Sequence, residues 1–161
     1  MNEGAASCSP ERIDVMIETM LDILFVEDNP ADVEMTLDAL NEHNLSNRVK
    51  VLRDGEEAAD YIFRTGPYKD CGMCDRPRLI LLDLKLPKID GLEILRRIRS
   101  DERTQGIPVV VLTSSLTDKD RIESYKLGVN SYIVKPVDFD NFAQAVAGIG
   151  LYWALLNKPP L

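Results

Sequence analysis

The chain has 161 residues, of which 45% are hydrophobic and 29% are charged, and its net charge is −8 at pH 7. These values predict one globular domain with a buried core, and the acidic balance argues against nucleic acid as a direct partner, because phosphate backbones are bound by Lys and Arg. No apolar run approaches the roughly 20 residues that cross a bilayer, and the chain does not open with a basic and apolar leader, so we expect a cytoplasmic protein.

Residues 1–20 are predicted to be an N-terminal extension. Ser9, Pro10 and Glu11 are typical of a helix start, because they supply a capping hydroxyl, a proline at the first helical position and an acid. Two interpretations follow. The segment is a frayed tail, with translation starting at Met16 or Met20, or it is a short helix that docks on the domain or on a partner; we favour the tail.

The next elements are a strand over residues 23–26, a helix from Pro30 to about Asn44 and a strand over residues 48–52. Residues 23–26 are all apolar, which is typical of a strand buried on both faces, whereas residues 48–52 alternate and indicate a half-exposed edge strand. A helix that starts after Asp54 and ends near Gly66 completes this half of the chain.

The second half repeats the alternation of strands and helices. Its predicted elements are a strand over 79–82, a helix from Gly91, a strand over 107–112, a helix over 117–128 with a capping box at Thr117 and Asp120, a strand over 132–134 and a helix from about Asp138. Five strands that alternate with five helices predict an α/β fold, a doubly wound parallel sheet with helices on both faces.

Asp83 directly follows the apolar strand Leu79–Leu82, and Pro87 and Gly91 then break the chain before a helix. This carboxylate therefore lies on a strand-to-helix turn at the carboxyl edge of the sheet, where open α/β sheets bind their ligands. We interpret Asp83 as the working group of the protein.

Other strands also end in polar groups, and parallel strands bring these ends to one edge. The groups are Glu27, Asp28, Asp83, Thr113, Ser114 and Lys135. Three carboxylates close together need compensating cations, which Lys135 and a bound Mg²⁺ can supply. Such a site can neutralise a phosphoryl group while an Asp oxygen attacks phosphorus, with the Thr113 hydroxyl holding a phosphoryl oxygen.

Four motifs in this order and spacing resemble the receiver domain of two-component response regulators. They are Ile23–Asn29, Leu82–Gly91, Val111–Ser114 and Tyr132–Pro136. The resemblance covers residues 22 to about 150 and implies a flavodoxin-like (βα)5 sheet with strand order 2-1-3-4-5. We expect a receiver domain over residues 21–157 with an extended C-terminal helix, and a tail over residues 158–161.

The resemblance also implies a role for each matching acid. Asp83 would be the phosphoacceptor, Asp28 would bind Mg²⁺ directly, and Glu27 would assist through water. The backbone carbonyl of Lys85 would be the third protein ligand, so that the side chain of Lys85 should matter little.

The remaining matches concern the residues that would change conformation when Asp83 is phosphorylated. Thr113 would be the switch hydroxyl, Lys135 the partner of the phosphoryl group, and Tyr132 the aromatic that turns inward when Thr113 moves. Pro136 resembles a family proline that often follows a cis peptide bond.

The implied function is that of a phosphoacceptor rather than an enzyme, since the domain would catalyse only its own phosphorylation and dephosphorylation. A sensor histidine kinase would be the donor of the phosphoryl group, and the face of the fourth helix, fifth strand and fifth helix would bind a downstream protein or a second copy of the chain.

Too few residues follow Lys135 for an output domain, so we expect a stand-alone receiver. Residues 29–32 and the apolar segment Leu151–Leu156 resemble the corresponding parts of stand-alone regulators that serve phytochrome-type kinases. Two interpretations of Leu151–Leu156 stay open: it folds back to cover the core, or it forms a face that binds a partner.

Single residues argue against other functions. Cys71 and Cys74 are best interpreted as reduced loop thiols, because a structural zinc site needs four ligands and no second pair exists, with His43 far away in sequence. A haloacid-dehalogenase-type phosphatase would need an acid at Lys85, and a nucleotide binder would need a Gly-rich loop where Glu27 and Asp28 stand. A phosphate-independent interaction module on the same fold remains the alternative function.

Overall fold

The computed structural model describes residues 23–42, 49–70, 77–114, 117–136 and 138–148. In chain order the elements are β1 (Ile23–Val26), α3 (Pro30–Glu42), β2 (Val49–Leu52), α4 (Gly55–Phe63), the 3-10 helix η1 (Gly66–Tyr68), β3 (Leu79–Leu82), α5 (Gly91–Ser100), β4 (Val109–Thr113), α6 (Asp118–Lys126), β5 (Ser131–Val134) and α7 (Phe139–Gly148). Among these described elements, no helix is long and apolar enough to span a membrane. The predicted N-terminal extension, Cys71, Cys74 and the apolar segment after α7 lie outside the described residues.

The five strands form one parallel sheet in the order β2-β1-β3-β4-β5, which confirms the predicted topology. Every residue of β1 and β3 is buried, as their uninterrupted apolar runs predict. Strand β2 lies at the edge and is mostly half-buried, as its alternating pattern predicts.

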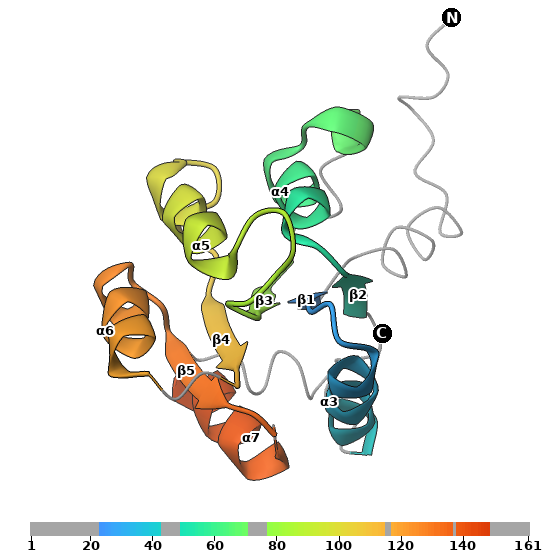
Figure 1. The fold of residues 1–161 in the computed structure, drawn as a ribbon, viewed down its shortest axis with the longest axis vertical. Helices are drawn as coiled ribbons and strands as arrows, with labels where there is room; N and C mark the ends of the chain where they lie inside the picture. Colours follow the sequence, from blue (N-terminus) through green and yellow to red (C-terminus); the bar gives the residue numbers. More distant parts are fainter. Residues whose placement is uncertain (1–22, 43–48, 71–76, 115–116, 137, 149–161) are drawn as a thin grey trace, which may run out of the picture.

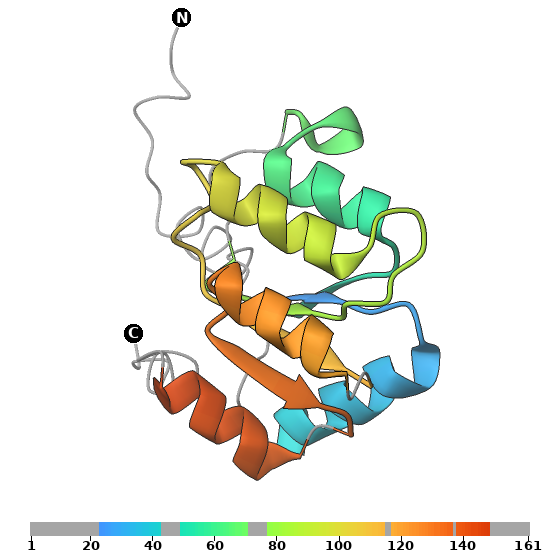
Figure 2. The same ribbon diagram turned by 60° about the vertical axis from the view of Figure 1, so that its left-hand side comes forward.

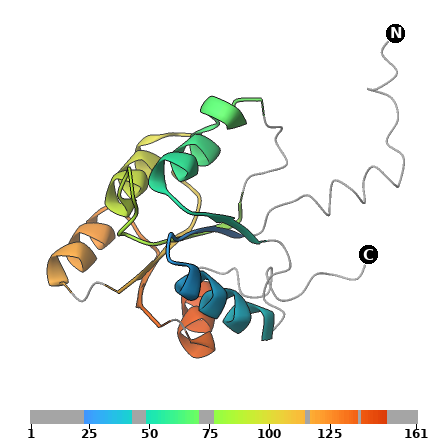
Figure 3. The same ribbon diagram turned by 45° about the vertical axis from the view of Figure 1, so that its right-hand side comes forward.

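Helices cover both faces of the sheet (Figures 1 and 3). Helices α4, α5 and α6 pack on one face, where α5 lies between the other two (Figure 2). Helices α3 and α7 pack on the other face. Alternate strand residues therefore serve two cores: Leu24 and Ile80 point to the first face, and Phe25 and Leu81 to the second.

The helix starts follow local capping chemistry. The Asp54 carboxylate accepts a hydrogen bond from the N–H of Glu57 at 2.7 Å, and the Asp90 carboxylate accepts one from the N–H of Glu93 at 2.9 Å. The predicted capping box at Thr117 is wrong, because the Thr117 side chain makes no capping hydrogen bond although the residue is the N-cap of α6.

Strand β4 begins later than predicted and includes Thr113. The N–H of Ile107 donates to the carbonyl of Thr104 in a turn, and Pro108 has no N–H to donate. The carbonyl of Pro108 still accepts from the N–H of Ile80 at 3.0 Å, so sheet pairing starts at this residue.

The turn between β3 and α5 packs closely on two glycines. The N–H of Gly55 donates to the carbonyl of Pro87 at 3.0 Å, and the N–H of Gly91 donates to the carbonyl of Leu84 at 2.8 Å. A Cβ at Gly55 would lie 1.7 Å from the carbonyl oxygen of Ile89, and one at Gly91 would lie 2.2 Å from the carbonyl oxygen of Asp83. Because only backbone without a side chain fits there, both glycines fix the path of the turn that carries Asp83.

We predict that Gly55→Ala lowers the free energy of unfolding by about 2 kcal/mol or more, because the added methyl group meets backbone that cannot move without shifting the turn. Gly106→Ala is the matched control, since nothing lies within 4 Å of its Cβ position, and it should change stability by less than about 0.5 kcal/mol. Urea unfolding followed by circular dichroism measures both. Equal stability of the two variants would contradict this account of the turn.

Candidate functional site

Three carboxylates meet at the carboxyl ends of the neighbouring strands β1 and β3. Glu27 and Asp28 follow β1, and Asp83 follows β3, whose last residue pairs with the last residue of β1. One carboxylate oxygen from each residue lies within 4.8 Å of the other two. Glu27 and Asp83 are buried, whereas Asp28 is exposed. The structure thus brings together the acids that the sequence analysis singled out.

The ammonium group of Lys135, which follows β5, lies among these acids. Its Nζ donates to Oε1 of Glu27 in a close ion pair and to Oδ2 of Asp83 at 3.3 Å. The Lys135 side chain is 11% exposed, so these pairs are largely removed from water. The lysine thus supplies the positive charge that the sequence predicts for the acidic site.

A fourth acid, Asp32, also contacts the lysine. Its Oδ2 lies 2.9 Å from Nζ of Lys135. Sequence reasoning noted residues 29–32 as a motif but did not assign Asp32 to the site. The sequence does carry a signal, because Asp32 lies in the first turn of a helix that begins only two residues after Asp28, and this first turn therefore stays at the same edge of the sheet.

Backbone N–H groups orient two of the carboxylates. Oε2 of Glu27 accepts from the N–H of Asp28 at 3.1 Å, and Oδ1 of Asp83 accepts from the N–H of Lys85 at 3.2 Å. The Lys85 side chain is exposed. The expected role of the Lys85 carbonyl as a Mg²⁺ ligand stays a prediction.

Thr113 and Tyr132 lie on the two strands next to the site. Thr113 is the last residue of β4 and is fully buried, and its carbonyl accepts from the N–H of Lys135 at 2.8 Å. Tyr132 pairs with Val111 across the β4–β5 ladder and packs half-buried against the first core. The peptide bond between Lys135 and Pro136 is cis, as the resemblance implies.

Burial and the close contact of charged groups shift the pKa values of Glu27 and Lys135. Burial, together with the hydrogen bond to Asp83, raises the pKa of Glu27 to about 8, and Lys135 only partly opposes this shift. Burial alone would lower the pKa of Lys135, but its hydrogen bonds to Glu27 and Asp32 and the charge of Asp83 raise that pKa above its usual range.

The donor set suits a hard divalent cation. Glu27, Asp28 and Asp83 offer oxygen ligands from three separate residues, and Mg²⁺ prefers carboxylate, carbonyl and water oxygens. A cation there would favour the charged form of Glu27 and so oppose the rise in its pKa that burial causes. The residues present therefore fit Mg²⁺.

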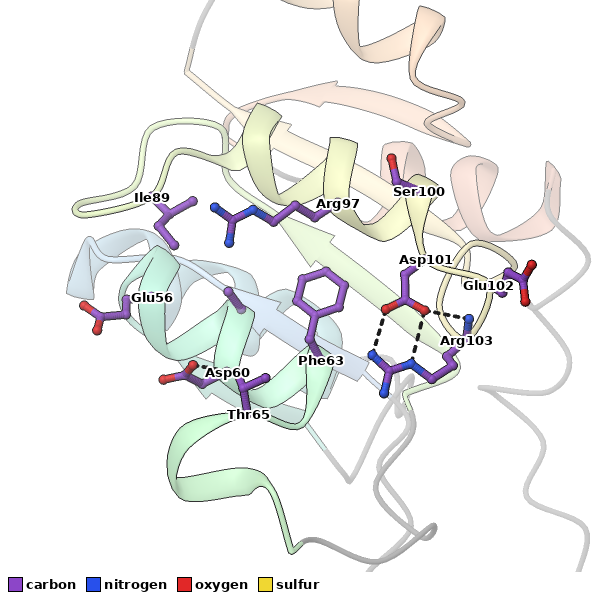
Figure 4. A pocket seen from close by; sticks show the side chains of 11 residues that line it. Glu56, Asp60, Phe63, Thr65, Ile89, Arg97, Ser100, Asp101, Glu102 and Arg103 are labelled. Carbon is purple, nitrogen blue, oxygen red and sulfur yellow. Dashed lines mark hydrogen bonds and ion pairs between the residues drawn. The ribbon is translucent and has the colours of Figure 1, made fainter.

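Away from the acidic site, a hollow of about 760 Å³ lies between α4 and α5 (Figure 4). It shares no residue with the acidic site. The Phe63 ring and Asp60 of α4 line the hollow on one side, and Arg97 of α5 lines it on the other. Arg97 and Arg103 are already paired with Glu93 and Asp101. Because its two arginines are already paired, we take the carboxylates at the strand ends, rather than this hollow, as the candidate functional site.

Comparison with known proteins gives a consistent match. The response regulator receiver domain family matches residues 23–147. The probable methanogenesis regulatory protein FilR2 of Methanothrix harundinacea is 41% identical over 138 residues, which cover 86% of each chain. Response regulator Rcp1 of Synechocystis sp. is 40% identical over 131 residues, which cover 81% of this chain and 87% of Rcp1.

Solved structures of response regulators also match this chain. The bacteriophytochrome response regulator RtBRR superposes with a TM-score of 0.76 at 50% identity, over 88% of this chain and 84% of that chain. The phosphorylated cyanobacterial phytochrome response regulator RcpA and the Mn(2+)-bound form of Rcp1 each give a TM-score of 0.69, at 41% and 38% identity, over 88% of this chain and 99% of theirs.

We predict that Lys135→Met destabilises the fold by about 3 kcal/mol at pH 9.5, because Glu27 and Asp83 lose their buried counter-charge. Without the ammonium group the pKa of Glu27 in the folded state rises above about 8, the raised value that it has beside Lys135. Glu27 is protonated in both folded proteins at pH 7, whereas above about pH 8 only the folded wild type readily releases this proton. The loss of stability should therefore be larger at pH 9.5 than at pH 7.

Urea unfolding at both pH values measures this difference. Lys88→Met is the control, since Lys88 pairs with Asp54 and Glu56 on the exposed surface, where little change is expected. A loss of stability that is the same at pH 7 and pH 9.5 would contradict the buried-charge explanation.

Proposed function

This chain belongs to the response regulator receiver family, and from that premise we propose that it is a two-component signalling switch whose phosphoacceptor is Asp83. One observation carries the proposal: the Lys135 ammonium lies among the buried carboxylates of Glu27 and Asp83 at the carboxyl edge of the sheet. A phosphoryl group on Asp83 would meet a cation already in place. The proposed donor is the phosphohistidine of a sensor kinase, and the bacteriophytochrome and phytochrome regulators among the similar structures support a phytochrome-type kinase.

In the proposed reaction an oxygen of Asp83 forms a bond to phosphorus while the bond from phosphorus to the histidine nitrogen breaks. The nitrogen keeps the electron pair and takes up a proton, and Asp83 becomes an acyl phosphate. Lys135 Nζ donates a hydrogen bond to a phosphoryl oxygen, which stabilises the charge as it moves. When bound, Mg²⁺ neutralises phosphoryl charge in the same way.

The proposed Mg²⁺ ligands are the carboxylates of Asp28 and Asp83 and the carbonyl of Lys85, with Glu27 acting through water. The grouping of the acids supports this assignment, as does the similarity of the chain to the Mn(2+)-bound form of Rcp1. Apart from its own phosphorylation and dephosphorylation, we propose no enzymatic activity. Lys85 occupies the position where a haloacid-dehalogenase-type phosphatase would need an acid.

The proposed output is a change on the face of α6, β5 and α7. Thr113 would move towards the phosphoryl group and Tyr132 would repack into the vacated space. Ile122 and Tyr125 on α6 and Val134 on β5 are exposed apolar side chains on the elements of this face. Such side chains favour a protein partner, either a downstream protein or a second copy of the chain.

We predict that acetyl phosphate adds the mass of one phosphoryl group to the wild type in the presence of Mg²⁺, and adds none when EDTA is present. Asp83→Asn should stay unmodified, because the amide is a poor nucleophile. Asp38→Asn removes an exposed acid on α3 and should react like the wild type. Intact mass spectrometry measures all three, and an Asp83→Asn protein that still gains the group would contradict the assignment.

We predict that Thr113→Ala still accepts the phosphoryl group but no longer changes the α6, β5 and α7 face, because the hydroxyl that follows the phosphoryl oxygen is missing. Hydrogen exchange of α6 with and without beryllium trifluoride measures the response. Thr113→Ser keeps the hydroxyl and should restore most of it. An unchanged response in Thr113→Ala would argue against Thr113 as the switch.

A further inference from the structure

Three carboxylates share the single ammonium group of Lys135, and they differ in exposure. A lysine ammonium has three N–H donors, and the described residues supply three acceptors: Oε1 of Glu27, Oδ2 of Asp32 at 2.9 Å and Oδ2 of Asp83 at 3.3 Å. A phosphoryl oxygen that binds Lys135 must therefore displace one of these partners or share its donor.

Exposure decides which partner can leave most easily. The Glu27 and Asp83 side chains are 1% and 6% exposed, whereas that of Asp32 is 31% exposed. A partly exposed carboxylate that loses its ion pair is solvated at once, but a buried one is left without a partner. Of the three carboxylates, Asp32 is thus the ion-pair partner that Lys135 can lose at the lowest cost.

The position of Asp32 is built into the start of α3. Pro30 begins the helix, and Oδ1 of Asn29 accepts from the N–H groups of Ala31 at 2.9 Å and Asp32 at 3.3 Å. An acid in the first turn also suits the helix dipole. The dipole explains an acid at this position, but it does not explain why the carboxylate reaches the lysine of a neighbouring loop.

Resting on the proposed function, we propose that Asp32 restrains Lys135 and thereby sets how readily Asp83 takes and keeps a phosphoryl group. Asp32 competes with the phosphoryl oxygens for the ammonium group, and its negative charge repels the phosphoryl dianion. It is a positioning residue that acts through Lys135. Its removal should strengthen phosphoryl binding, which is the opposite of what general damage to the site would do.

The test is binding of beryllium trifluoride, a phosphoryl mimic, to the full chain in the presence of Mg²⁺, measured by fluorine NMR titration. Asp32→Asn should lower the Kd about threefold to tenfold, from the loss of one partly screened ion pair and of one like charge. It should also raise the initial rate of modification by acetyl phosphate. Asp32→Glu keeps the carboxylate and should return both values towards those of the wild type.

Asp38→Asn is the matched control, since it removes the same charge from an exposed position on the same helix. An unchanged or raised Kd in Asp32→Asn, or an equal decrease in Asp38→Asn, would overturn the proposal. Asp32→Ser serves as a second variant if Asp32→Asn does not fold. Failure of the folded wild type to bind the mimic would instead overturn the proposed function itself, and the proposal about Asp32 with it.

Discussion

The ion pairs of one lysine hold the site together. Nζ of Lys135 contacts Glu27, Asp32 and Asp83, which come from the regions after β1 and β3 and from the start of α3. Without the lysine, the carboxylates would repel one another, and the buried ones would favour their neutral form. The positive charge of the lysine partly neutralises this cluster of carboxylates. The negative charge that remains makes the site suitable for a divalent cation.

The fold supplies the geometry that these ion pairs need. A parallel sheet brings the ends of β1, β3, β4 and β5 to one edge, so residues far apart in sequence become neighbours without long connections. The turn after Asp83 is held against α4 and α5 at Gly55 and Gly91, where a side chain would collide with backbone. A rigid turn of this kind places the Asp83 carboxylate and the N–H of Lys85 that binds it.

The alternation of strands and helices and the acids at the strand ends were predictable from sequence, because their signals are local, whereas the strand order followed only from the family resemblance. Uninterrupted apolar runs identify β1 and β3, and an acid directly after each run marks the functional edge. The pair between Asp32 and Lys135 was not foreseen, because it joins residues more than 100 positions apart and depends on side-chain reach. The capping box at Thr117 failed for a related reason: residue types permit that hydrogen bond, but the side-chain conformation decides whether it forms.

The most direct test of the central claim is to locate the phosphoryl group within the chain. After incubation with acetyl phosphate and Mg²⁺, borohydride reduction converts an aspartyl phosphate to homoserine, and peptide mass spectrometry shows which residue has changed. The account predicts homoserine at position 83 in the wild type and none without Mg²⁺. Homoserine at a different acid, or a stable phosphoryl group on Thr113 or Ser114, would contradict it.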